Sequence, residues 1–163
     1  MRFLVTGAAG FIGMHTSIKL LNNKHKVLGI DNLNSYYSKK LKLDRLKILK
    51  QYKNFKFLKA NIVSKNKVEK VVNKFKPSHV LHFAAQPGVR YSLINPDAYT
   101  KSNLIGFSNI LEVCKKNDVE VSNLCYNRKL KPFAACRTCM VETVVDGKKE
   151  LVYSCTHPVA EGM

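Results

Sequence analysis

A short apolar run followed at once by three spaced glycines constrains the fold of this chain more than any other stretch. The run Phe3–Val5 has the length and composition of a buried strand, and it leads into Gly7, Gly10 and Gly13. Glycine permits a tight turn and lets a phosphate group approach the backbone. The apolar positions between Phe11 and Leu21 favour a helix packed on a sheet, whose N-terminal N–H groups and dipole attract anions. The stretch therefore predicts the strand–turn–helix that receives the pyrophosphate of a dinucleotide.

An acidic residue stands at the distance that a dinucleotide fold requires. The second apolar run, Val27–Ile30, ends in Asp31, eighteen residues after Gly13. In such folds an acid at this place accepts hydrogen bonds from the adenosine ribose hydroxyls. A secretory signal is disfavoured, because no small-residue cleavage site follows the first apolar run.

Strand and helix patterns alternate four times, as far as about Asn117. Further strands are expected at 55–60 and 79–85, and helices at 39–50, at 64–75 and from Pro96 onward, with Ser64 as a cap. Such alternation predicts a parallel sheet with helices on both faces. The predicted fold class is α/β: a truncated Rossmann-like parallel sheet of order 3-2-1-4, with a short cysteine-rich, ferredoxin-like tail.

The chain is strongly basic, with 28 Lys and Arg against 11 Asp and Glu and a net charge of +17. A basic domain of this kind can bind nucleic acid. Here the lysines interrupt apolar periodicity as they do on solvated helix faces, and no zinc-finger or helix-turn-helix pattern is present, so nucleic acid is a disfavoured partner. A basic, non-catalytic binding module stays an alternative. No segment reaches the length of a membrane span, and we expect a cytoplasmic protein.

Several segments in order resemble the extended short-chain dehydrogenase/reductases, the NAD-dependent nucleotide-sugar epimerases. Gly29–Tyr37 and Ala84–Ser92 are most similar to the UDP-glucuronate 4-epimerases within that family, and the resemblance covers residues 1–120. It implies NAD as the cofactor. It also implies pyrophosphate contacts from Gly7, Gly10, Phe11, Ile12 and Gly13, ribose contacts from Asp31 and Asn32, adenine contacts from Asn61 and Ile62, and further contacts from Phe83, Ala84, Ala85 and Asn103. Asn61 stands where the family usually has an acid, which removes a charge from adenine recognition.

The same resemblance implies hydride transfer that uses a Tyr-x-x-x-Lys pair after a fifth strand, and this chain leaves the family pattern before that region. Tyr36 and Lys40 have the spacing, but they lie after the second strand, at the adenosine end, so we treat it as coincidence. No catalytic residue is assigned. We therefore expect an NAD-binding portion that is catalytically incomplete, with a nucleotide sugar as partner only if a missing C-terminal part completes it.

From Val119 the composition changes, and four cysteines follow with the spacing C-x10-C-x2-C-x15-C: Cys125, Cys136, Cys139 and Cys155. Four thiolates suit a 2Fe–2S cluster or a zinc ion, although a zinc ribbon usually has two C-x-x-C knuckles and only one is present. Residues 121–163 resemble the 2Fe–2S domain of the large iron–sulfur subunit of respiratory NADH dehydrogenase, most clearly in the runs 136–142 and 154–163. That resemblance implies that these four cysteines ligate a 2Fe–2S cluster. Cys114 lies at an apolar helix position and is expected to be buried.

The chain is thus expected to have two parts, an NAD-binding portion at 1–118 and a partial 2Fe–2S segment at 119–163. The stretch Ile110–Val121 suits either family, which predicts a chimera joined where two sequences are locally similar. The alternative function is an iron–sulfur electron-transfer module related to respiratory NADH dehydrogenase.

Overall fold

Four parallel strands form one sheet in the first of two compact units, Met1–Val121 and Ser122–Met163. The structure is a computed structural model and describes residues 1–119, 140–145 and 148–153. The strands are β1 (Arg2–Thr6), β2 (Lys26–Asp31), β3 (Phe55–Lys59) and β4 (His79–His82), in the order β3-β2-β1-β4. The register pairs Thr6 with Ile30 on one side and with His82 on the other. The predicted order 3-2-1-4 is confirmed.

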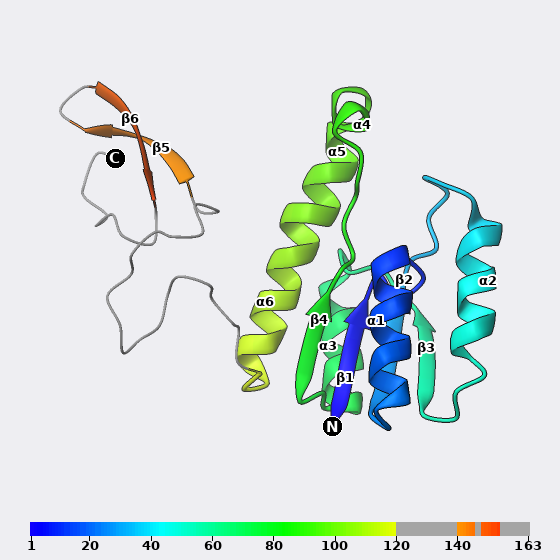
Figure 1. Cartoon of the computed structure of the whole chain (residues 1–163). Coiled ribbons are helices and arrows are strands. Elements are labelled where there is room, and N and C mark those ends of the chain that lie inside the picture. Colours follow the sequence, from blue (N-terminus) through cyan, green and yellow to red (C-terminus); the bar gives the residue numbers. More distant parts are fainter. Residues whose placement is uncertain (120–139, 146–147, 154–163) are drawn as a thin grey trace. The chain divides into compact units, whose positions relative to one another are not determined.

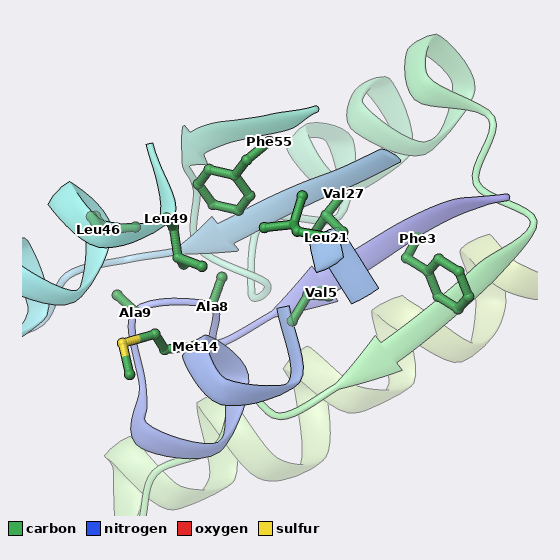
Figure 2. Packing of buried hydrophobic residues seen from close by; sticks show 10 residues of the cluster. All are labelled: Phe3, Val5, Ala8, Ala9, Met14, Leu21, Val27, Leu46, Leu49 and Phe55. Carbon is green, nitrogen blue, oxygen red and sulfur yellow. The ribbon is translucent and has the colours of Figure 1, made fainter. Parts of the chain in front are cut away.

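Helices cover both faces of this sheet (Figure 1). Side chains from α1 (Phe11–Asn22) and α2 (Lys39–Leu49) share one core with Phe3 and Val5 of β1, and Figure 2 shows this core. Side chains from α3 (Lys65–Phe75) and α6 (Phe107–Lys116) share a second core with Leu4. Successive residues of a strand point to opposite faces, so β1 contributes to both cores.

The inner face of α2 differs from the expected one. Leu41, Leu46 and Leu49 have helical spacing in the sequence, which favours a shared apolar face, but Leu41 is 45% exposed while Leu46 and Leu49 are buried. Lys42 takes the inner position instead and is only 4% exposed. Lys42, Leu46 and Leu49 follow the i, i+4, i+7 spacing of a single helix face.

The region after β4 is the part that sequence patterns described least well. The expected strand 79–85 ends at His82, and the next residues form a loop and a short helix, α4 (Val89–Ile94), that no pattern indicated. The expected helix from Pro96 is continuous but changes type: α5 (Pro96–Tyr99), the π-helical η1 (Thr100–Gly106) and then α6. The Asn95 side chain caps α5 by accepting a hydrogen bond from the Ala98 N–H at 3.1 Å.

The ends of α3 lie as predicted, but the cap is made differently. Ser64 is the N-cap residue, yet its backbone carbonyl, not its side chain, accepts the first hydrogen bonds, from Lys67 and Val68. The helix ends at Phe75, and its C-cap residue Lys76 has a left-handed backbone (φ 48°) and precedes Pro77.

In the second unit the described residues form an antiparallel pair, β5 (Met140–Val145) and β6 (Lys148–Tyr153), with Met140 opposite Tyr153. Across the described parts of both units, no helix has the length and apolarity needed to cross a membrane.

Candidate functional site

The glycine turn joins β1 to α1 and needs glycine at two points. Gly7 has a left-handed backbone (φ +67°), and a Cβ there would lie 2.8 Å from the backbone of Phe83 and Ala84. A Cβ on Gly13 would lie 2.8 Å from the Gly7 carbonyl carbon and closer still to its oxygen. The turn is closed by the Gly10 N–H, which donates to the Gly7 carbonyl at 2.9 Å. The first turn of α1 is thereby brought close against the ends of β1 and β4.

Asp31 stands at the end of β2, beside this turn. Its Oδ2 accepts a hydrogen bond from the Ala9 N–H at 3.2 Å, and its Oδ1 accepts one from the Leu33 N–H at 2.8 Å. The residue is 7% exposed and lines the same cleft as the glycine turn. The carboxylate is therefore held in place by backbone groups on both sides.

Two cations from α2 also line the cleft, and sequence patterns did not identify them as site residues. Lys42 Nζ donates to Asn34 Oδ1 at 2.7 Å and lies 3.8 Å from Asp31 Oδ1. Burial lowers the pKa of Lys42, and the neighbouring Asp31 carboxylate opposes that shift. The signal that could have found Lys42 is its place on the same helix face as Leu46 and Leu49.

Arg45 is the second of these cations and reaches across to the glycine turn. Its guanidinium donates to the Ala9 carbonyl at 3.4 Å and to the Tyr37 hydroxyl at 3.3 Å, and it lies 5.9 Å from the Phe11 ring centre. Burial raises the pKa of Tyr37, and the Arg45 charge acts against that shift. The helix α2 thus places two positive charges beside Asp31 and the start of α1.

The far side of the cleft is formed by the ends of β3 and β4. Asn61 and Ile62 follow β3; Ile62 is buried, and Asn61 Oδ1 accepts the Val63 N–H at 3.1 Å. Phe83, Ala84 and Ala85 follow β4 in the loop that replaces the expected end of that strand. Phe11 and Ile12 are 65% and 61% exposed and do not pack on the sheet as their apolar character suggested. They line the cleft, where the family resemblance had placed them.

Asn103 does not line the cleft but supports a residue close to it. Its Oδ1 accepts the Gln86 N–H at 2.8 Å, and its Nδ2 donates to the Gln86 carbonyl at 3.1 Å. Ser102, its neighbour in η1, does line the cleft. Asn103 therefore holds the loop after β4 through the backbone of Gln86, from a position outside the cleft lining.

Together these residues surround a cleft of about 550 Å³ at the carboxyl ends of the strands. In open parallel sheets this edge is the usual place for a bound ligand. The structure brings together twelve of the thirteen predicted cofactor residues around it: Gly7, Gly10, Phe11, Ile12, Gly13, Asp31, Asn32, Asn61, Ile62, Phe83, Ala84 and Ala85.

The four predicted cluster ligands, Cys125, Cys136, Cys139 and Cys155, lie outside the described residues. Cys114 lies in α6 and is 4% exposed, within the second core. Burial raises the pKa of its thiol. The prediction that Cys114 is buried is confirmed.

Comparison with known protein families shows which family this chain belongs to. The family model described as GDP-mannose 4,6 dehydratase matches residues 4–128. The chain belongs to that family. A second model, the 2Fe-2S iron-sulfur cluster binding domain, matches residues 108–163, so the two matched ranges overlap at 108–128.

Relatives of this GDP-mannose 4,6 dehydratase family member include a probable UDP-glucuronate 4-epimerase. Protein CapI of Staphylococcus aureus is 45% identical over 126 residues, which are 77% of this chain and 37% of that protein. A probable UDP-glucuronate 4-epimerase of Rhizobium meliloti is 42% identical over 71% of this chain and 34% of that protein. The chain therefore spans about a third of the length of these curated relatives. The predicted resemblance to nucleotide-sugar epimerases is confirmed.

Solved structures agree with this assignment. UDP-glucose 4-epimerase of Thermus thermophilus, in complex with NAD, has a TM-score of 0.63 at 36% identity, covering 74% of this chain and 35% of that one. UDP-glucuronic acid 4-epimerase of Bacillus cereus, also in complex with NAD, has a TM-score of 0.64 at 33% identity, covering 71% and 36%. The fold of residues 1–119 is that of the Rossmann-like part of these enzymes.

Proposed function

We propose that residues 1–118 are the NAD-binding portion of a nucleotide-sugar epimerase-like protein. The observation that supports this most is the Asp31 carboxylate, held at the end of β2 beside the glycine turn and lining the same cleft. The relatives with solved structures hold NAD, which agrees with this use of the cleft.

The residues present suit such a ligand. The close approaches at Gly7 and Gly13 leave no space for a side chain where a pyrophosphate would meet the backbone. The Asp31 carboxylate accepts two N–H groups, and since two oxygens offer about four acceptor positions, it can still accept from ribose hydroxyls. Lys42 and Arg45 offset the negative charge of a dinucleotide. Bound NAD would supply a hydride acceptor.

Titration with NAD tests this proposal. We expect saturable binding by calorimetry, and an Asp31→Asn variant should bind at least about tenfold more weakly, since one charged hydrogen bond is worth about 1.5–3 kcal/mol. Asp44→Asn is the matched control, because Asp44 lies on α2 with its carboxylate paired to Lys47 outside the cleft. Absence of NAD binding by the folded wild-type chain would overturn the proposal.

We propose further that a nucleotide sugar binds only when the C-terminal portion of an epimerase completes the site. This rests on the share of the relatives that the chain matches, about a third. UDP-glucuronate should therefore give no heat of binding in the same calorimeter while NAD does. Tight binding of UDP-glucuronate by this chain alone would contradict the proposal.

A second candidate function is favoured by the match of a 2Fe-2S domain to residues 108–163. We propose that Cys125, Cys136, Cys139 and Cys155 hold a 2Fe–2S cluster, on the strength of this match and of their spacing. Anaerobic reconstitution should yield two irons and two sulfides per chain, and Cys136→Ser should lower that yield. Cys114→Ala is the control, because Cys114 is buried in the first unit. Zinc in place of iron would contradict the assignment.

We also propose that the chain is a chimera, since both family matches include residues 108–128. A single sequencing read across this stretch of the source DNA should show one continuous reading frame, and an interrupted frame would contradict a chimeric gene. The cytoplasmic location and the lack of a nucleic-acid partner stay predictions.

A further inference from the structure

The Thr6 hydroxyl, one residue before the glycine turn, is surrounded by three polar atoms. It accepts a hydrogen bond from the Ala84 N–H at 3.0 Å and another from the Phe83 N–H at 3.1 Å. The Phe83 N–H also donates to the backbone carbonyl of Thr6, at 3.2 Å. The third contact of the hydroxyl is His82 Nδ1, at 2.8 Å. A hydroxyl has one hydrogen and two acceptor positions. With two amides donating to it, Thr6 must donate its hydrogen to His82.

The direction of this hydrogen bond determines the protonation state and the tautomer of the His82 imidazole. If Nδ1 accepts, His82 is neutral and carries its proton on Nε2. A protonated imidazolium has an N–H on both nitrogens, so Nδ1 could no longer accept the Thr6 hydrogen. It would instead compete with Phe83 and Ala84 for the Thr6 oxygen.

The segment that Thr6 holds is part of the cleft itself. Phe83 and Ala84 line the cleft together with Gly7. A Cβ on Gly7 would lie 2.8 Å from the Ala84 nitrogen and from the Phe83 carbonyl group, so the two backbones are already in close contact. A small displacement of the Phe83–Ala84 segment would therefore change the space beside the glycine turn.

The surroundings of His82 favour the neutral ring. The Phe107 ring of α6 lies 5.5 Å from the imidazole, and burial lowers the pKa of His82. Arg2 is at the opposite end of β1 from Thr6, by the register of the strands. In the helix α6, from which Phe107 comes, Glu112 forms an ion pair with Lys65 and Lys116 forms one with Glu69. Lys101 of η1 forms an ion pair with Asp97.

We propose that His82 is a positioning residue for the dinucleotide cleft. As a neutral acceptor for the Thr6 hydroxyl, it orients the Phe83–Ala84 segment against Gly7 and so sets the affinity for NAD. This inference rests on the proposed NAD-binding function, and it names a residue of β4 that is not among the residues lining the cleft.

Two pairs of variants of the full chain test the hydrogen bond. His82→Leu and Thr6→Val remove the acceptor and the donor, whereas His82→Asn and Thr6→Ser retain them. We expect His82→Leu and Thr6→Val each to weaken NAD binding about tenfold or more, the factor that corresponds to the loss of about one hydrogen bond. His82→Asn and Thr6→Ser should each stay within about threefold of the wild-type affinity. Thr6→Val also removes the acceptor of the Phe83 and Ala84 N–H groups, so it should weaken binding at least as much as His82→Leu does. The double variant with Leu and Val should bind no more weakly than Thr6→Val alone, because His82 acts only through the Thr6 hydroxyl.

His79→Leu is the matched control, because His79 is also on β4 but is exposed and contacts Phe3 and Ser78. It should leave NAD affinity unchanged. Affinity in the wild type should also fall as the pH drops below about 6.5, because burial lowers the pKa of His82 in the folded chain, and His82→Asn should reduce that fall. A folded His82→Leu variant that binds NAD like wild type, or an Asn variant that loses as much affinity as the Leu variant, would overturn the inference.

Amide hydrogen exchange separates this inference from the proposed function. If wild type binds no NAD, the proposed function fails, but the exchange of the Phe83 and Ala84 amides still reports on positioning. Faster exchange at these two amides in His82→Leu than in His82→Asn, with the Leu4 amide of β1 unchanged, would support the role of His82. Equal exchange in the two variants would overturn it.

Discussion

At Gly13 an added methyl group would meet the backbone of Gly7, which cannot move without shifting the whole turn. We predict that Gly13→Ala destabilises the first unit by about 1–3 kcal/mol, the usual cost of forcing extra volume into a close-packed site. Urea unfolding without ligand measures this. Gly10→Ala is a graded control, because its Cβ would lie 3.0 Å from the Gly7 oxygen, a contact that a small shift can relieve. Equal losses in the two variants would show that the close approach at Gly13 is not the cause.

At the scale of a residue, His82 should also affect how the free energy of unfolding depends on pH. Burial lowers the pKa of His82 in the folded chain below its ordinary value of 6.5. The unfolded chain therefore binds a proton at a higher pH than the folded chain does. The stabilising contribution is fully present above about pH 6.5 and is lost as the pH falls through the lower, folded-state pKa.

Urea unfolding of wild type and His82→Asn at pH 8 and pH 5.5 checks this sign. The decrease in the free energy of unfolding between the two pH values should be larger in wild type, because all other titratable groups are common to both chains. A larger decrease in the variant would contradict the prediction.

At the scale of elements, one buried amide joins α6 to the loop after β3. Asn109 Nδ2 donates to the carbonyls of Ile62 and Val63, both at 3.0 Å, and Asn109 is 8% exposed. We predict that Asn109→Ala lowers the free energy of unfolding by about 1–3 kcal/mol, because two carbonyls lose their donor. Asn73→Ala, at an exposed position of α3, should change it little. Because Ile62 lines the cleft, NAD affinity should fall with Asn109→Ala and not with the control.

At the scale of the whole molecule, both described cores are built from residues before 120. We predict that a chain ending at Val121 unfolds cooperatively and binds NAD as tightly as the full chain. A chain ending at Asn109 is the control, because it loses Ile110, Val113 and Cys114 from the second core. Circular dichroism and NAD titration of the two shortened chains measure this. Failure of the longer one to fold would contradict the predicted boundary near 118.

The predictions that sequence supported best concern local features. The glycine turn, the strand–helix alternation and the place of Asp31 each depend on residue types within about twenty positions, and the structure agrees with all three. The order 3-2-1-4 also followed, because right-handed crossovers leave few topologies for such a pattern. What sequence could not indicate is how far β4 continues, since His82 ends the strand although apolar residues follow it.

The sequence by itself therefore determined the fold class, the family and most of the residues around the cleft, since these follow from spacing along the chain. Only the tertiary structure decided that Lys42 is buried beside Asp31, that Asn103 holds Gln86, and that Thr6 bonds to His82. The physical reason is separation: Thr6 and His82 are 76 positions apart, and a hydrogen bond over that distance depends on the register of two strands. The hydrophobic pattern of each strand restricts which registers keep its apolar face buried. Which residue of β4 lies opposite Thr6 is fixed only when the sheet has packed.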